Sequence, residues 1–478
     1  MEASGFVPGD AAAEALVKLP QGSNVKAMSP GSRERLDRVM PQLLIAARQT
    51  AAPVACLLRL VQLVQAVARR SSYLALLEEQ PAARRRLARL FADRAFLAER
   101  VIAQPLLLDD VLDPRIDQLP LKRADISAEI ARVLSTLDER EAEAELERIN
   151  EFKASVAFRL GLAFSDGRAD AVSTARRLAA LAESVVVAVT ALAERELAAQ
   201  HGRLPGEGSG FAVLGYGSLG GEELGFASDL DLVFVYDGRR AQAMSDGPRP
   251  LEGSRWYQRL AQRVMNWLTM MTRAGRLYEV DTRLRPDGSK GLLVSSFDAF
   301  AAYQRGRAWT WEHQALLRAR PVVGDVALHA DLAALRREIL AIARDVDVVY
   351  DEVSSMRRRW RAERDRSDPS RFDLKQGPGG LLDIEFALQG LVLAHAVRHP
   401  SLLEMTSNAA LVEACRDAAL LDAGQAEVFL HAHAELLQRA LTCTLDLRSR
   451  IGEREPELMQ LVATVQAVTR ALGFAFES

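Results

Sequence analysis

Two aspartates near the middle of the chain have the residue type and spacing that best suit catalysis. Asp229 and Asp231 stand two residues apart at the head of an apolar run that ends at Tyr236. Alternate residues of a strand point to the same face, so the two carboxylates should lie side by side and repel each other unless a cation lies between them. Carboxylate oxygens suit Mg²⁺, which protein sites share with substrate phosphates. The alternative is an exposed strand end where both aspartates are merely solvated.

A glycine-dense turn lies just upstream of this pair. Residues 215–221 read Gly-Tyr-Gly-Ser-Leu-Gly-Gly and follow directly on the apolar run 211–214. Without side chains in the way, the backbone N–H of Gly217 could approach a phosphate, and Ser218 adds a hydroxyl donor. Glycine turns that bind nothing are common. Coupled to the aspartate pair, however, the turn favours a phosphate and metal site over a solvated strand end.

A third acid is expected on a neighbouring strand. In the run 277–284, alternation puts Glu279, Asp281 and Arg283 on one face. Asp281 is the better candidate because it lies deeper in the run and basic residues follow it. Its alternative role is a structural salt bridge with Arg283. The basic residues of this glycine-loosened loop could bind and neutralise a triphosphate, and they are Arg283, Arg285 and Lys290.

A small sheet is needed to position these residues. Apolar runs predict strands at 211–214, 230–236, 277–284 and 292–296, with a helix over 256–272. Before and after this block, apolar residues recur at helical spacing. The β-branched run at 185–189 lies between Ala- and Leu-rich flanks, which favour a buried helix segment. The predicted fold class is therefore α+β and predominantly helical, with a small mixed sheet flanked by N-terminal and C-terminal helical domains.

The composition is that of an ordinary soluble globular protein with several domains. Of the 478 residues, 49% are hydrophobic and 26% charged, and the net charge is -3. This balance gives no global attraction to nucleic acid or to an anionic membrane, so neither is an expected partner. The start of the chain lacks the pattern of a signal peptide, and we expect a cytoplasmic location. The three cysteines, Cys56, Cys415 and Cys443, lack metal-ligand spacing and should be buried reduced thiols.

The constellation resembles the DNA polymerase β-like nucleotidyltransferase superfamily, in which a Gly-Ser turn binds phosphate and three carboxylates hold two metal ions. Within it, the chain resembles glutamine synthetase adenylyltransferase, of the bifunctional adenylyltransferase/adenylyl-removing family, through the segments 213–236, 281–286, 308–316 and 372–386. The resemblance implies that ATP is a substrate and that two Mg²⁺ ions bind. The implied catalytic and metal-binding residues are Asp229, Asp231 and Asp281. The implied nucleotide-binding residues are Gly217, Ser218, Arg283, Arg285 and Lys290.

Full members of that family have two related halves, of which the N-terminal one removes AMP by phosphorolysis and the C-terminal one attaches it. This chain carries one such site, and the segments 281–283 and 309–316 resemble the adenylylating half. The resemblance therefore implies transfer of AMP from ATP to a tyrosine hydroxyl of glutamine synthetase, with release of pyrophosphate and down-regulation of nitrogen assimilation. Three alternatives stay open: phosphorolytic removal of AMP, giving ADP; another polymerase β-like nucleotidyltransferase; and a non-catalytic regulatory module.

The same resemblance implies further partners and a domain plan. Glutamine synthetase would be the protein substrate, and the nitrogen-signalling PII protein and glutamine would be effectors. The expected domains are a flexible lead-in (1–35), a helical connector (36–200), a nucleotidyltransferase catalytic domain (201–335) and a C-terminal helical regulatory bundle (336–478). Two stretches have open roles. Residues 375–385 are either a regulatory element facing the site or simply the start of a helix, and the charge run 84–86 is most simply a solvated helix face.

Overall fold

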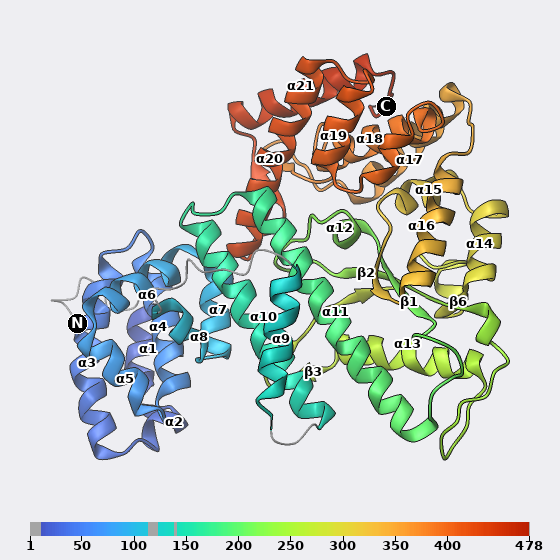
Figure 1. The fold of residues 1–478 in the computed structure, drawn as a ribbon. Coiled ribbons are helices and arrows are strands. Elements are labelled where there is room, and N and C mark those ends of the chain that lie inside the picture. Colours follow the sequence, from blue (N-terminus) through green and yellow to red (C-terminus); the bar gives the residue numbers. More distant parts are fainter. Residues whose placement is uncertain (1–10, 113–122, 138–140, 478) are drawn as a thin grey trace. The chain divides into compact units, whose positions relative to one another are not determined.

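The computed structural model describes residues 11–112, 123–137 and 141–477, and Figure 1 shows its fold. The chain forms two compact units that alternate along the sequence. The first comprises residues 1–119, 154–168 and 442–449, and the second comprises 120–153, 169–441 and 450–478, in each case apart from the residues outside the described ranges. The helical stretch 36–200 is thus divided between the units, whereas most of 201–478 belongs to the second.

The first unit is built mainly from short helices. They are α1 (Ala11–Lys18), α2 (Ser23–Lys26), α3 (Pro30–Arg48), α4 (Pro53–Val67), α5 (Ser71–Glu79), α6 (Pro81–Asp93), α7 (Ala95–Ala103) and α8 (Leu107–Leu112), with a 3-10 turn at Leu19–Gln21. Proline stands at the beginning of α3, α4 and α6, where a missing N–H costs nothing. The second half of α10 (Ala142–Ser165) also belongs to this unit.

The poorly ordered lead-in expected over residues 1–35 is wrong for its described part, which is helical from Ala11. Ala12, Leu19 and Val25 bury their side chains and thereby fix these short helices. The small and helix-breaking residues mark helix boundaries: the Ser29 side chain accepts a hydrogen bond from the N–H of Ser32 and caps α3. Residues 1–10 lie outside the described residues.

The second unit contains a five-stranded mixed sheet. Its strands are β1 (Phe211–Gly215), β2 (Leu230–Tyr236), β5 (Val280–Asp281), β6 (Val294–Ser296) and β7 (Arg320–Gly324). The order is β5-β2-β1-β7, and β6 also pairs with β2. β1 is antiparallel to β2 and β7, whereas β5 and β6 run parallel to β2. This mixed sheet within a predominantly helical chain confirms the predicted α+β class.

The first two predicted strands are confirmed, but the third is much shorter than its apolar pattern suggested. β5 ends at Asp281 because the carboxylate of that residue accepts a hydrogen bond from the backbone N–H of Arg283 at 2.8 Å, which turns the chain. The predicted helix over 256–272 is α13 (Gly253–Thr269), and the hairpin of β3 (Met271–Thr272) and β4 (Gly275–Arg276) follows it.

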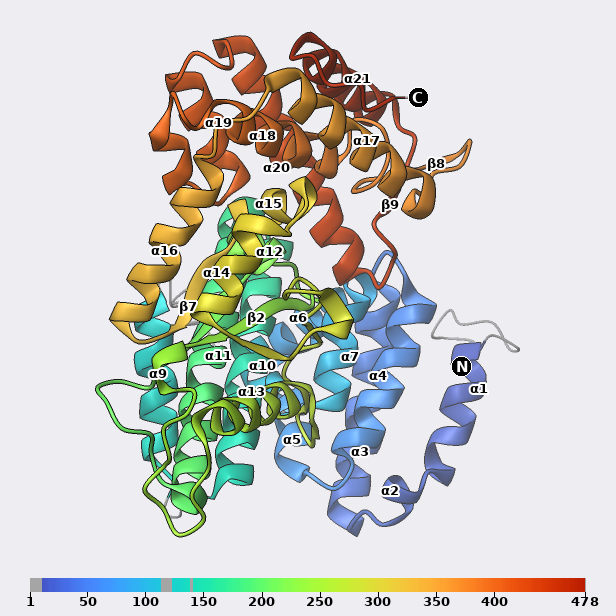
Figure 2. The ribbon, with the colours of Figure 1, turned by 90° about the vertical axis from the view of Figure 1, so that its right-hand side faces the viewer.

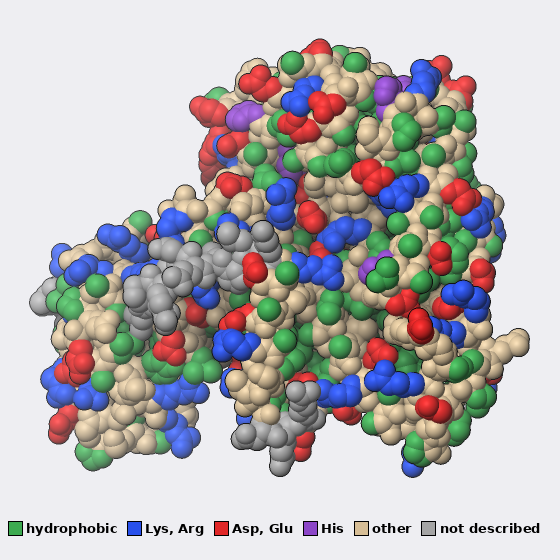
Figure 3. Space-filling model, in the orientation of Figure 1, with side chains coloured by type: hydrophobic (Ala, Val, Ile, Leu, Met, Phe, Trp, Pro, Cys, Tyr) green, Lys and Arg blue, Asp and Glu red, His purple; other side chains and the backbone are tan. Residues whose placement is uncertain are grey.

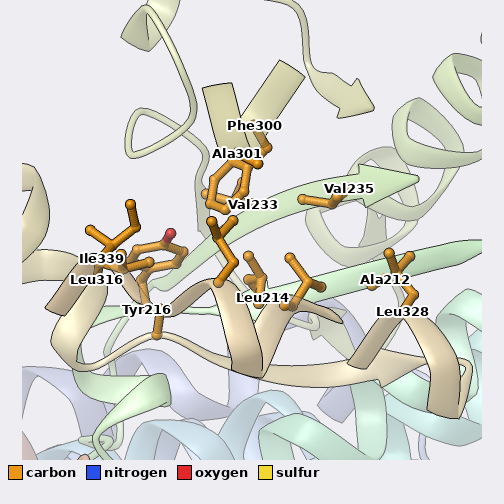
Figure 4. Close-up of a cluster of buried hydrophobic side chains, with 13 residues drawn as sticks. Ala212, Leu214, Tyr216, Val233, Val235, Phe300, Ala301, Leu316, Leu328 and Ile339 are labelled. Carbon is orange, nitrogen blue, oxygen red and sulfur yellow. The ribbon is translucent and has the colours of Figure 1, made fainter. Parts of the chain in front are cut away.

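Both faces of the sheet are covered by helices. On one face, alternate residues of β1 and β2 pack against α14 (Phe297–Gly306), α15 (Thr310–Leu317) and α16 (Val326–Leu340), as Figure 4 shows. On the other face, Phe211 stacks with Phe234 and with Tyr257 of α13, and the ring centroids of Phe211 and Tyr257 are 6.2 Å apart. α11 (Ala171–His201) packs along α13, and its buried run 184–186 confirms the predicted buried helix segment.

The C-terminal helices of the second unit gather around α18 (Leu381–His395), as Figures 1 and 2 both show. Its neighbours are α17 (Val346–Arg364), α19 (Asn408–Asp417) and α21 (Pro456–Ala471). α18 is apolar nearly all round, as a central helix must be. α20 (Ala423–Leu445) and the hairpin of β8 (Arg371–Asp373) and β9 (Ile451–Glu453) complete this part.

The distribution of charged side chains and the state of the cysteines agree with the composition. Acidic and basic side chains are interspersed over the face shown in Figure 3, in keeping with the small net charge. Cys56, Cys415 and Cys443 are buried, as predicted, and none of them forms a disulfide within the described residues. Within the described ranges, no helix combines the length and the apolar character that crossing a bilayer requires.

Candidate active site

Asp231 and Asp281 lie on adjacent parallel strands and are register partners. Paired residues of neighbouring strands project to the same face, so the parallel pairing of β2 and β5 brings together two acids that are far apart in the sequence. Gly217 lies directly against the first of them, because a Cβ at Gly217 would overlap the Asp231 carboxylate. The structure therefore places the glycine turn and two of the three predicted acids side by side.

Asp229 lies just before β2 rather than within it, and it is exposed. The predicted pair of strand residues is thus one strand residue and one residue of the preceding loop. Its charge still acts on the site: burial, and then the negative charges of Asp229 and Asp281, raise the pKa of Asp231 to about 6. Carboxylates that oppose one another's ionisation are a donor set that fits a divalent cation such as Mg²⁺.

The Asp281 carboxylate forms an ion pair with Arg283. Nε of Arg283 donates to Oδ2 of Asp281 at 2.8 Å, and hydrogen bonds from Arg283 lower the pKa of Asp281. The alternative role predicted for Asp281 is therefore the arrangement seen here. In the part of the chain that the structure describes, no three potential ligands are grouped closely enough to hold an ion. The Arg283 side chain is 73% exposed, and an exposed pair contributes only about 0–1 kcal/mol, so a cation or a phosphate can draw it apart.

Arg285 and Lys290 differ in their freedom to meet a nucleotide. The guanidinium of Arg285 donates to the Thr282 hydroxyl at 2.6 Å and to the Gly291 carbonyl at 3.3 Å, so it braces the loop. Lys290 is exposed at the end of a 3-10 turn (Gly288–Lys290), and its ammonium has no ion-pair partner among the described residues. The three predicted basic ligands therefore differ. Arg283 forms an ion pair with Asp281, Arg285 forms hydrogen bonds within its own loop, and Lys290 forms no ion pair with any described residue.

The glycine turn itself forms a single helical turn, α12 (Gly217–Gly220), directly after β1. Gly217 has a φ of 51°, a conformation that suits glycine. At Gly221 the reason for glycine is different, because a Cβ there would overlap the guanidinium of Arg318. Ser218 is half-buried, and its hydroxyl makes no hydrogen bond to any residue within the described ranges. Asp231 and Arg318 thus leave no room for side chains at Gly217 and Gly221, and the Ser218 hydroxyl is available to bind a ligand.

Arg318 is a residue that the sequence analysis missed. It is buried, and its guanidinium donates to Glu223 at 2.7 Å and to Glu385 at 2.6 Å. Glu223 also accepts from the N–H of Asn408 at 2.8 Å and lies 3.5 Å from Nε2 of His433. Burial opposes ionisation of Glu223, but Arg318 and His433 outweigh it and lower its pKa to about 2. Arg318 therefore links the segment after the glycine turn to α18, and Glu223 links it to α19 and α20.

The segment 375–385 has features of both of its predicted roles. Asp383 is buried and accepts from Arg357 at 2.7 Å and from the N–H of Gly379 at 2.7 Å, as a structural residue at the start of a helix does. Lys375 is half-buried, and its charge interacts with those of Glu385 and Asp231. Asp383 thus fixes the start of the helix. The charged residues at the two ends of the segment interact with the site: Lys375 with Asp231, and Glu385 with Arg318.

Replacing Arg318 with alanine is expected to lower the free energy of unfolding by about 3–5 kcal/mol, because Arg318 is buried and the mostly buried carboxylates of Glu223 and Glu385 lose their shared partner. Chemical denaturation measures this directly. Arg337→Ala is the matched control, because Arg337 pairs with Glu404 at 2.9 Å with both side chains about half exposed, and its loss should lower the free energy of unfolding far less than the loss of Arg318 does. Equal losses from the two substitutions would show that Arg318 is not the buried link described here.

Residues 84–335 match the family model of glutamate-ammonia ligase adenylyltransferase, and residues 353–477 match a model described as GlnD PII-uridylyltransferase. The chain belongs to the glutamate-ammonia ligase adenylyltransferase family, which confirms the resemblance read from the sequence.

Curated relatives named bifunctional glutamine synthetase adenylyltransferase/adenylyl-removing enzyme match nearly the whole chain. The one from Stenotrophomonas maltophilia is 48% identical over 99% of this chain and 50% of its own length. That of Xanthomonas campestris pv. campestris is 50% identical over 97% of this chain and 49% of its own length. The one from Nitrosococcus oceani is 42% identical over 99% of this chain and 49% of its own length. The chain thus spans about half the length of the curated relatives it matches.

Proposed function

We propose that this chain transfers AMP from ATP to a tyrosine hydroxyl of glutamine synthetase and releases pyrophosphate. The observation that carries the proposal is the pairing of Asp231 with Asp281 beside Gly217, in a chain of the adenylyltransferase family. Adenylylation is favoured over removal of AMP because the segments 281–283 and 309–316 resemble the adenylylating half. The relatives are also named for adenylyl removal, so phosphorolysis, with phosphate as the nucleophile, is the second candidate.

The acids, the glycine turn and the basic loop of the site have different proposed roles. Asp229, Asp231 and Asp281 would hold Mg²⁺, which when bound neutralises phosphate charge and favours an oxygen nucleophile. The turn at Gly217 and Ser218 would receive the phosphates through N–H and hydroxyl donors.

The exposed charges of Arg283 and Lys290 would stabilise the departing pyrophosphate, and Arg285 would hold their loop in shape. The tyrosine oxygen forms a bond to the α-phosphorus as the bond from that phosphorus to the bridging oxygen breaks. The hydroxyl proton passes to the carboxylate of Asp281 or to water.

The C-terminal helices are proposed as a regulatory part of the same chain. The match of residues 353–477 to a family described by PII uridylylation supports a link to nitrogen signalling, and PII protein and glutamine are the proposed effectors. The ion pairs of Arg318 with Glu223 and Glu385 give such a part a direct connection to the segment after the glycine turn. A reaction between ATP and a metabolic enzyme also makes the cytoplasm the proposed location.

The direction of the reaction can be tested with two assays. Incubated with ATP labelled at the α-phosphate, Mg²⁺ and unmodified glutamine synthetase, the chain should leave label on the synthetase and release unlabelled pyrophosphate. Adenylylated synthetase with inorganic phosphate should give little ADP. The Asp231→Asn chain serves as the control and should label nothing. Robust ADP formation in the second assay, without labelling in the first, would assign the phosphorolytic reaction instead.

A further inference from the structure

A second concave site lies in the first compact unit. It is a pocket of about 660 Å³, and residues of α6, α8 and the end of α10 line it. Five arginines line its wall: Arg85, Arg86, Arg89, Arg94 and Arg168. Asp93 and Asp166 are its two acids. A pocket of this size falls in the range of about 300–1,000 Å³ that small-molecule sites occupy.

Helix α6 supplies three of these arginines from one side. Arg85, Arg86 and Arg89 are spaced one and four residues apart, which places them on one face of the helix. The opposite face, with Leu87 and Phe91, is buried in the unit. The charge run at residues 84–86, expected as a solvated helix face, thus divides: Arg85 and Arg86 line the pocket, whereas Arg84 donates to the carbonyl of Glu78 at 2.8 Å at the end of α5.

The positive charge of this pocket is only partly compensated. Arg94 pairs with Asp446 at 2.8 Å, and Arg168 pairs with Asp166 at 3.0 Å. Arg85, Arg86 and Arg89 form no ion pair with any residue that the structure describes. Their charges reach across the pocket, since burial and then the charge of Arg86 lower the pKa of Arg168. Like charges gathered in one concavity raise the local concentration of an anion that can neutralise them.

We propose that this pocket binds a small anion carrying two or more phosphate groups, such as an inorganic polyphosphate or a nucleoside polyphosphate. Planar guanidinium groups bind phosphate oxygens through paired N–H donors, and three unpaired ones on a single helix face suit several phosphates better than one. A protein partner would need a surface of about 800 Å², and a nucleic acid would need a longer basic track; a single concave pocket of this size fits a small molecule. The proposal does not rest on the AMP-transfer reaction.

Titration calorimetry of the full chain with inorganic tripolyphosphate, in EDTA and at low salt, tests the proposal. Saturable binding is expected, and the double variant Arg86→Ala/Arg89→Ala should weaken it at least 10-fold. Arg84→Ala is the matched control, because it removes a charge from the same helix but not from the pocket, and it should bind as the unaltered chain does. Asp231→Asn should also leave binding unchanged. Loss of binding with Asp231→Asn would place the ligand at the carboxylate site and overturn the proposal.

A thermal melt provides an independent readout that separates binding from folding. Without ligand, Arg86→Ala/Arg89→Ala should melt at the same temperature or higher, because like charges have been removed from an exposed helix face. Tripolyphosphate should raise the melting temperature of the unaltered chain and leave that of the double variant unchanged. Citrate, an anion without phosphate, and inorganic phosphate should both bind much more weakly. Equal binding of citrate, or tripolyphosphate binding unaffected by the double substitution, would refute the site.

Discussion

Asp231→Asn is expected to reduce the proposed AMP transfer by about 10²–10³-fold, the usual cost of removing one preorganised electrostatic group from an active site. The same substitution should make the metal-free protein more stable. Burial and the charges of Asp229 and Asp281 raise the pKa of Asp231 from an ordinary value of 3.8 to about 6. The folded state therefore favours the protonated side chain, which asparagine imitates. Loss of activity together with a gain in stability is what distinguishes a cation site from a structural carboxylate.

The pH dependence of that gain follows from the direction of the pKa shift. A raised carboxyl pKa contributes stability that is complete below the unfolded value and is lost as the pH rises through about 6. A shift of this size corresponds to about 3 kcal/mol at most, and partial solvent access reduces the expected gain to about 1–2 kcal/mol. Melting curves in EDTA should thus show a stabilised variant at pH 8 and a smaller difference at pH 5.

Glu279→Gln is the matched control for Asp231→Asn. Glu279 was predicted on the same face as Asp281, but it is exposed and pairs with Arg276 outside the site. Its substitution should leave AMP transfer within about threefold of the unaltered chain, since surface pairs contribute little. Asp229→Asn should reduce transfer as Asp231→Asn does, with a smaller gain in stability because Asp229 is exposed. Near-normal turnover by either aspartate variant would remove the basis of the metal assignment.

The sequence was most informative where local alternation decides the outcome. The strand at 230–236 and the expectation of a third acid on a neighbouring strand follow from apolar runs and from the two-residue period of a strand. The register that sets Asp231 against Asp281 comes from the parallel pairing of β2 with β5. The ion pair of Asp281 with Arg283 was foreseen only as an alternative, because a turn in which a carboxylate captures a backbone N–H competes with continued strand pairing. The strand pattern alone does not show whether the chain continues the strand or turns at Asp281.

Long-range contacts set the limit of the sequence analysis. Arg318 has its partners Glu223 and Glu385 far away in the chain, and its own surroundings show only an arginine after an apolar run. Residues 154–168 and 442–449 join the first unit through tertiary packing that no local signal marks. For the same reason, a charge run such as that at 84–86 predicts an exposed face but not the concavity beneath it.

Gly217→Val is the second substitution with a large expected effect, and it tests whether the turn serves the acids. With a φ of 51°, Gly217 has a conformation that costs an L-residue about 1–2 kcal/mol and a β-branched one more. Its Cβ would also overlap the carboxylate of Asp231. The variant should therefore displace the acid, block the approach of phosphate to the backbone, and reduce AMP transfer by at least about 10²-fold.

Ser218→Ala is the control within the same turn. It removes one available hydroxyl without straining the backbone, so nucleotide binding should weaken by only about 1–2 kcal/mol. Equal effects from the two substitutions would mean that the turn is structural and does not meet phosphate.

A double-mutant cycle separates backbone strain from the clash with Asp231. Gly217→Ala should lower the free energy of unfolding in the unaltered chain through both causes. In an Asp231→Ala background the carboxylate is gone, so only the strain of the positive φ is left and the loss should be smaller by about 1 kcal/mol or more. Denaturant titrations of the four proteins in EDTA give the coupling energy. A coupling energy near zero would show that Gly217 and Asp231 act independently, and that the turn does not position the acid on which the proposed chemistry depends.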